Sequence, residues 1–290
     1  MRLFNLLPRR SRPVSPSVAT QVIGLCRFSY PTLDGFQSGP ATLPERIAYL
    51  HDPVRLDERF RLFEAFTLPS IRAQTDADFT FLIVHGSDLP KAQRDRLHDL
   101  VAGIPQVVVQ AHEPGPHRPV MKGAINSVRR PGCYSIQFRQ DDDDAIGTGF
   151  VASLRKVVQD AFPLFQANRH VSVSQTRGWN ACASALGIHA APVQRIYPAV
   201  AFAIVFRPDV QLSVMNFAHH DIWKHMPTLT LADPDMLVRG GNAHNDSGTQ
   251  IGTDLPLLTP DQEALFQRAF GISAAQVRAL YAPRPAGGRG

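Results

Sequence analysis

Four consecutive aspartates, Asp141 to Asp144, follow an apolar run that predicts a buried strand at residues 133–140. Aspartate is a poor strand former, and like charges side by side repel one another. Such a cluster is stable either fully in water or around a cation. The apolar residues on both sides favour a place at the mouth of a sheet, and a solvated acidic loop is the alternative interpretation.

The spacing of these carboxylates suits a metal ion. Side chains alternate between the two faces of a strand, so Asp141 and Asp143 are expected on one face and Asp142 and Asp144 on the other. One face then offers two carboxylates to a hard cation, and Mg²⁺ or Mn²⁺ binds through one or two carboxylates, water and phosphate oxygens. The sequence therefore predicts a Mg²⁺ or Mn²⁺ site suited to a nucleoside-diphosphate substrate.

The elements that must position this cluster alternate between strand and helix in the first half of the chain. Apolar runs predict strands at 21–30, 79–85, 106–110 and 133–140. Helical spacing and capping residues predict helices at 55–69, 88–102 and 121–129, with an interruption of the first at Pro69. This order favours a parallel, doubly wound sheet, whose ligands bind beyond the carboxyl ends of the strands.

The second half is expected to add a helix near 150–161 and strands at 170–174 and 201–206. Capping boxes at Thr259 and Ser273 predict two C-terminal helices. No apolar stretch approaches the roughly 20 residues that span a bilayer.

The net charge of +5 comes from the two ends of the sequence. Six arginines lie in tails that contain no acidic residue: Arg2, Arg9, Arg10, Arg12, Arg284 and Arg289. Without them, the rest of the chain has 24 basic and 25 acidic residues, so it lacks the positive charge of a nucleic-acid-binding protein. At most, the basic tails would make peripheral contact with a membrane.

Three widely spaced cysteines, Cys26, Cys133 and Cys182, form no CxxC pair and are expected to be reduced thiols of a cytoplasmic protein.

Three segments, at 27–31, 59–90 and 139–146, make the sequence resemble the putative rhamnosyltransferase family, whose members are bacterial proteins with a GT-A-type glycosyltransferase core. They contain RFSYP, the block from RFRLFEAF to GSDLP, and RQDDDDAI. The resemblance runs from about Val22 to about Asn245. It implies a GT-A-like α/β domain at 20–258, between a basic disordered tail at 1–19 and C-terminal helices at 259–282, with a second disordered tail at 283–290.

The resemblance implies a metal-dependent transfer of a sugar from a nucleoside-diphosphate donor to a glycan or other hydroxyl acceptor, with inversion. It matches the aspartate run to the DxD position of the family. Asp141 and Asp143 are then the metal ligands, and Asp142 and Asp144 contact the donor, although the opposite register remains an alternative. Rhamnose and a role in polysaccharide synthesis are implied by the resemblance alone.

Further donor contacts are expected at Arg27, Phe28 and Ser29, which follow the first strand where GT-A proteins bind the nucleotide base. Phe28 is either a base-stacking ring or a core aromatic. Arg177, beside Gly178 and Trp179, belongs either to a sugar-binding loop or to a turn with a packed tryptophan.

The densest polar region lies late in the chain, around His219 to Asp221 and Arg239 to Asp246. The resemblance implies a third metal ligand from this part, for which His244 is the candidate. An inverting transfer also needs a general base beside the acceptor hydroxyl. Asp221 is the first candidate and His220 the second, while an exposed helix end is the alternative interpretation.

Two other functions compete with the transferase. One is a different metal-dependent enzyme acting on phosphates, which the absence of a GxxxxGK[ST] loop disfavours. The other is a non-catalytic GT-A-like protein that binds a glycan or a partner.

Overall fold

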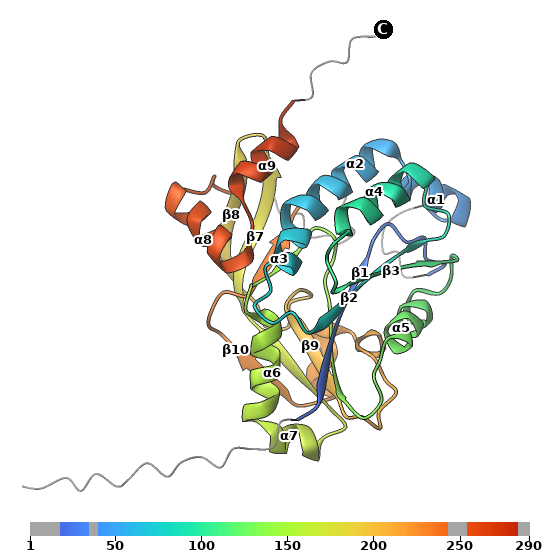
Figure 1. Cartoon of the computed structure of the whole chain (residues 1–290), viewed down its shortest axis with the longest axis vertical. Coiled ribbons are helices and arrows are strands. Elements are labelled where there is room, and N and C mark those ends of the chain that lie inside the picture. Colours follow the sequence, from blue (N-terminus) through green and yellow to red (C-terminus); the bar gives the residue numbers. More distant parts are fainter. Residues whose placement is uncertain (1–17, 35–39, 243–253, 284–290) are drawn as a thin grey trace, which may run out of the picture.

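The computed structural model of the 290-residue chain describes residues 18–34, 40–242 and 254–283. Within these ranges the strands form two sheets, one of seven strands and one of four. Helices cover the larger sheet, and two C-terminal helices lie beside the smaller one (Figure 1).

The larger sheet has the strand order β10-β6-β9-β4-β1-β2-β3. Its strands are β1 (Thr20–Arg27), β2 (Phe79–Gly86), β3 (Val107–His112), β4 (Tyr134–Arg139), β6 (His170–Gln175), β9 (Phe202–Phe206) and β10 (Thr228–Leu231). All neighbours pair in parallel except β9, which is antiparallel to both β4 and β6. The expected α/β architecture with a mostly parallel sheet flanked by helices is confirmed.

Successive residues of β1 alternate between two apolar layers, because strand side chains point to opposite faces. Val22 and Cys26 belong to one layer, whereas Ile23 and Leu25 belong to the other. The first layer is closed by α2 (Pro53–Leu62), a π-helical turn (Phe63–Thr67), α3 (Leu68–Arg72), α4 (Lys91–Val101), α6 (Phe150–Asp160) and α7 (Phe162–Ala167). The second is closed by α5 (His117–Ser127) and the 3₁₀ helices η2 (Val214–Asn216) and η3 (His219–Lys224).

The interruption expected at Pro69 is a π-helical turn that comes just before it. The backbone N–H of Leu68 bonds to the carbonyl of Phe63, five residues earlier. Proline cannot donate a backbone hydrogen bond, and the wider turn allows α3 to continue beyond it. A further helix, α1 (Leu43–Leu50), begins behind the capping box of Thr42 and Glu45.

The smaller sheet has the order β5-β11-β7-β8. Its strands are β5 (Ala145–Ile146), β11 (Leu237–Gly240), β7 (Arg177–Ser184) and β8 (Gly187–Gln194). Helices α8 (Pro260–Phe270) and α9 (Ala274–Tyr281) share an apolar cluster with it. Because Arg177–Asn180 opens β7, the prediction of a loop or turn there is wrong. Among the described helices, none has the length and apolar character needed to cross a bilayer.

Candidate active site

A cleft of about 560 Å³ lies where the two sheets meet. The carboxyl ends of β1 and β4 contribute Arg27, Ser29 and the four aspartates. The smaller sheet contributes Asn180, Arg239 and Gly240, and η3 contributes its first two residues. The cleft thus combines acidic, basic and backbone polar groups at the edge where α/β sheets bind their ligands.

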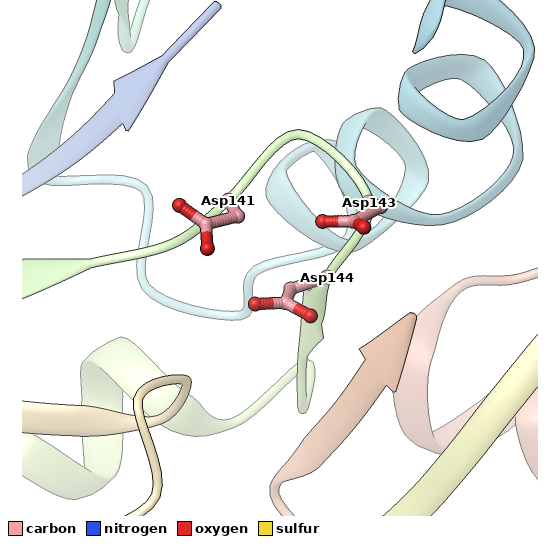
Figure 2. Close-up of side chains that lie close together, drawn as sticks. All are labelled: Asp141, Asp143 and Asp144. Carbon is pink, nitrogen blue, oxygen red and sulfur yellow. The ribbon is translucent and has the colours of Figure 1, made fainter. Parts of the chain in front are cut away.

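The four aspartates form a tight turn between β4 and β5 and are not part of a strand. The N–H of Asp144 bonds to the carbonyl of Asp141 at 3.2 Å, which closes the turn. Strand alternation therefore does not apply. Asp141, Asp143 and Asp144 each offer a carboxylate oxygen within 4.8 Å of the others, around one shared space (Figure 2).

Asp142 points instead to a buried arginine of α2. Nε of Arg59 donates to one carboxylate oxygen of Asp142 at 3.0 Å, and Nη2 pairs with the other. Asp142 is 3% exposed and Arg59 is 7% exposed, so the pair is held away from water. Its carboxylate is committed to fixing the turn against α2, and its expected contact with the donor is not supported.

Asp143 and Asp144 are buried and hydrogen-bonded. Asn242 donates to Asp143 at 2.7 Å, and the N–H of Gly240 donates to Asp144 at 3.0 Å. Burial raises the pKa of Asp143, although Arg59 opposes the rise. Burial, followed by the charges of Asp143 and Asp141, raises the pKa of Asp144 well above its usual range. Burial and mutual repulsion thus disfavour the charged forms of these two carboxyl groups.

The chemistry of this donor set fits a hard divalent cation, since it consists of carboxylate oxygens alone. A carboxylate has about four acceptor positions, so the hydrogen bonds to Asp143 and Asp144 leave room for a metal bond. Asp141 is the exposed member of the set and faces the open cleft. The predicted third ligand, His244, lies outside the described residues.

The residues at the carboxyl end of β1 lie in different surroundings. Arg27 and Ser29 line the cleft, and the hydroxyl of Ser29 accepts a hydrogen bond from Arg55 at 3.2 Å. Phe28 is fully buried and packs on Phe60 and Phe63, with ring centroids 4.8 and 5.7 Å away. Its predicted contact with the donor is wrong, because no ring face is open to a ligand.

Arg177 is not among the residues that line the cleft. It forms ion pairs with Asp233 and Asp235, at 3.1 and 3.0 Å. The indole of Trp179 donates to Asp235 at 3.0 Å and packs against Phe266. The tryptophan is therefore packed, as the alternative expected, but it lies in a strand and not in a turn. Arg177 belongs to this structural cluster, and its predicted contact with the donor is not supported.

The two candidate general bases, His220 and Asp221, differ in their position relative to the cleft. His220 lines the cleft with a side chain that is 70% exposed. Asp221 is absent from the cleft lining and pairs with Lys224 at 2.8 Å. The hydrogen bond from Lys224 lowers the pKa of Asp221, which weakens it as a base. The order of preference therefore reverses, and His220 is the better placed of the two.

Several cleft residues are not anticipated by the sequence analysis, chiefly the arginines Arg55, Arg59 and Arg195 and the histidine His117. Arg55 and Arg59 stand four residues apart on an amphipathic helix, beside the apolar face that contains Phe60. That spacing could have identified them in the sequence, because two arginines on a buried helix face require acidic partners. Burial, with Arg27 and Arg139, lowers the pKa of His117 to about 4.

Comparison with curated proteins finds no match. Several solved structures are similar to the chain at low sequence identity. TarS 1-349 from S. aureus is 11% identical, with a TM-score of 0.40, over 76% of this chain and 60% of the TarS 1-349 chain, so the match spans less than two thirds of that neighbour. Its complex with UDP-GlcNAc is 12% identical, with a TM-score of 0.42, over 91% and 71% of the two chains. A putative nucleotide-diphospho-sugar transferase from Desulfovibrio desulfuricans G20 is 11% identical, with a TM-score of 0.40, over 91% and 94%.

A family model described as "Putative rhamnosyl transferase" matches residues 21–254. This range agrees with the resemblance expected from about Val22 to about Asn245 and contains every described residue that lines the cleft. The chain therefore belongs to the putative rhamnosyl transferase family.

Proposed function

We propose that the protein is a metal-dependent glycosyltransferase that moves a sugar from a nucleoside-diphosphate donor to a glycan or other hydroxyl acceptor, with inversion. The observation that carries this proposal is the acidic turn in the cleft, where three carboxylates converge within 4.8 Å. Family membership supports the same class of reaction. Rhamnose is the sugar suggested by the family's description.

Asp141, Asp143 and Asp144 would hold Mg²⁺ or Mn²⁺, and His244 remains a prediction for a further ligand. When bound, the metal would supply positive charge to the diphosphate oxygens as the glycosidic bond breaks. Arg27 and Arg239 line the same cleft. In this proposal they orient the diphosphate, which carries about two negative charges, and stabilise the leaving group.

His220 is the proposed general base that removes the proton from the acceptor hydroxyl. Its ring lines the cleft, and its Nε2 lies 3.8 Å from a carboxylate oxygen of Asp221. That distance is too long for a hydrogen bond, so Asp221 does not orient the ring directly.

A thermal-shift screen tests the donor site. UDP, dTDP, GDP and CMP are each added with Mn²⁺, Mg²⁺ or EDTA. A nucleotide present at about 100 times its dissociation constant adds about 2.7 kcal/mol to the free energy of unfolding, which raises Tm by a few degrees. We expect one nucleotide to give a shift that needs the metal.

The variant for this screen is Asp141→Asn, because Asp141 is exposed and its replacement leaves the buried pairs intact. Asp95→Asn on α4, also exposed, is the matched control. The shift should disappear in the first variant and persist in the second. No shift with any nucleotide would overturn the donor site and favour a non-catalytic binding protein.

A further inference from the structure

Trp223 has an unusual position for a tryptophan. It lies on η3, and 61% of it is exposed. Tryptophan is highly buried on average, and a large apolar side chain in water near a cleft is typical of a binding surface. The other tryptophan, Trp179, is only 7% exposed and packs in the core.

The geometry of η3 places Trp223 beside the cleft. In a 3₁₀ helix, residues three apart lie on the same side. His220 and Trp223 are three apart, and His220 lines the cleft. The indole therefore extends the cleft lining outward from the proposed general base.

This helix is held firmly, so the exposure of Trp223 is a stable feature of the rim. Ile222 is fully buried in the apolar layer beneath η3. Nδ1 of His219 donates to the carbonyl of Tyr197 at 2.8 Å, which ties η3 to the segment that contains Ile196. A preorganised aromatic surface loses little conformational entropy when a ligand binds.

The cleft rim near η3 is both apolar and polar. Ile196 is 71% exposed and lines the cleft. Nζ of Lys224 lies 5.4 Å from the centroid of the Trp223 ring and forms an ion pair with Asp221. The rim thus offers flat apolar surface, with hydrogen-bond donors and acceptors beside it. A pyranose ring has matching features, since its C–H face is apolar and its edge carries hydroxyls.

We propose that Trp223, with His220 and Ile196, forms the acceptor site, and that the acceptor is a glycan whose pyranose ring stacks on the indole. This inference rests on the proposed function and names its acceptor class. Stacking on Trp223 would deliver a neighbouring hydroxyl to His220. The Asp221–Lys224 pair would bond hydroxyls at the edge of the same ring.

Tryptophan fluorescence reports on this site directly, because the chain has two tryptophans and one is buried. Iodide quenching of the full chain is measured with methyl glucoside, methyl mannoside, methyl rhamnoside, maltotriose, cellotriose and chitotriose at millimolar concentrations. At least one saccharide should protect the exposed tryptophan. Trp223→Phe should abolish the protectable signal while leaving that of Trp179.

Saccharide affinity is then measured by saturation-transfer NMR. Trp223→Ala should weaken binding of the protecting saccharide roughly tenfold, and Trp223→Phe by less, since an aromatic face remains. Leu186→Ala, which removes an exposed apolar side chain from the turn between β7 and β8, is the matched control and should change nothing.

The outcomes separate this inference from the proposed function. If a nucleotide binds with metal but no saccharide protects Trp223, the acceptor site is overturned and the transferase proposal stands. If a saccharide protects Trp223 but no nucleotide binds, the glycan site stands and the donor assignment fails. Self-association of the chain that depends on Trp223, without saccharide binding, would make this surface an interface between two copies and overturn the proposal.

Discussion

Asp141 and Asp142 are neighbours in the chain but have opposite surroundings. Asp141 is exposed in the cleft, whereas Asp142 is buried against Arg59. A buried pair from which one partner is removed leaves an uncompensated charge in a low-dielectric interior. We therefore expect Asp142 to fix the turn, and the other three aspartates to bind the metal.

The first prediction compares two alanine substitutions by urea unfolding. Asp142→Ala should lower the free energy of unfolding by about 3 kcal/mol, because the carboxylate contact that remains to Arg59 within the described residues is the longer one, 3.4 Å to Asp143. Asp141→Ala should change it by no more than about 0.5 kcal/mol, as for other exposed sites. Equal effects of the two substitutions would contradict the assignment.

The second prediction concerns pH. His117 has a pKa lowered to about 4 from 6.5, so between these values the unfolded chain binds a proton that the folded chain does not. This group therefore reduces stability as pH falls from about 6.5 towards 4. His117→Asn should shrink the loss of Tm between about pH 7 and pH 5 by roughly 2 °C, measured by calorimetry. An unchanged or larger loss in the variant would contradict it.

The limits of sequence reasoning at this scale are visible in Phe28 and Arg59. The acidic turn is identifiable because four adjacent carboxylates are rare in an apolar setting. The role of each carboxylate is not identifiable from the sequence. It depends on a turn that brings Asp142 to Arg59 of α2, which lies 83 residues earlier in the chain. Phe28 follows a strand in either interpretation, and only the packing of α2 shows that its ring is buried.

At the scale of elements, β11 holds the acidic turn in place. Val238 pairs with Ala145 of β5, and Gly240 bonds to Asp144. A Cβ on Gly240 would meet the backbone oxygen of Asp143 well inside contact distance. The close approach of these two backbones thus requires glycine at this position.

The third prediction follows from this contact. Gly240→Ala should lower the free energy of unfolding by about 2 kcal/mol and abolish the metal-dependent nucleotide shift. Gly123→Ala in α5, where a Cβ would meet nothing within 4 Å, is the matched control. It should raise stability by roughly 0.5–1 kcal/mol. A stable Gly240→Ala protein that keeps the nucleotide shift would contradict this account of the turn.

Strands β1 and β2 of the larger sheet were predictable because each is a nearly continuous apolar run. The edge strand β10, with the sequence TLTL, was not predicted. The hairpin of β7 and β8 was not predicted either, since its sequence is rich in alanine and glycine and lacks a clear two-residue period. Its strands are specified by pairing with β11 and by burial under α8 and α9. These contacts link distant parts of the chain, and local propensity does not reveal them.

At the scale of the whole molecule, one apolar cluster joins the smaller sheet, the C-terminal helices and the π-helical turn after α2. Phe266 is fully buried in this cluster, with its ring centroid 5.4 Å from those of Trp179 and Phe270. The C-terminal helices are thus packed against strands that line the cleft. We expect them to unfold together with the main domain.

The fourth prediction tests this coupling. Phe266→Ala should lower the free energy of unfolding by about 4 kcal/mol, whereas Arg268→Ala, exposed on the same helix, should have little effect. In the wild type, urea transitions followed by tryptophan fluorescence and by far-UV circular dichroism should coincide. Two separate transitions would show that the C-terminal helices and the smaller sheet unfold independently of the larger sheet, which would contradict this coupling.

The central claim is that the acidic turn binds a divalent cation together with a nucleoside diphosphate. Titration of Mn²⁺, followed by electron paramagnetic resonance with and without the nucleotide found in the thermal screen, tests it most directly. The account predicts Mn²⁺ binding that the nucleotide tightens, that Asp141→Asn weakens and that Asp95→Asn leaves unchanged. Mn²⁺ binding that is absent, or equal in all three proteins, would contradict it.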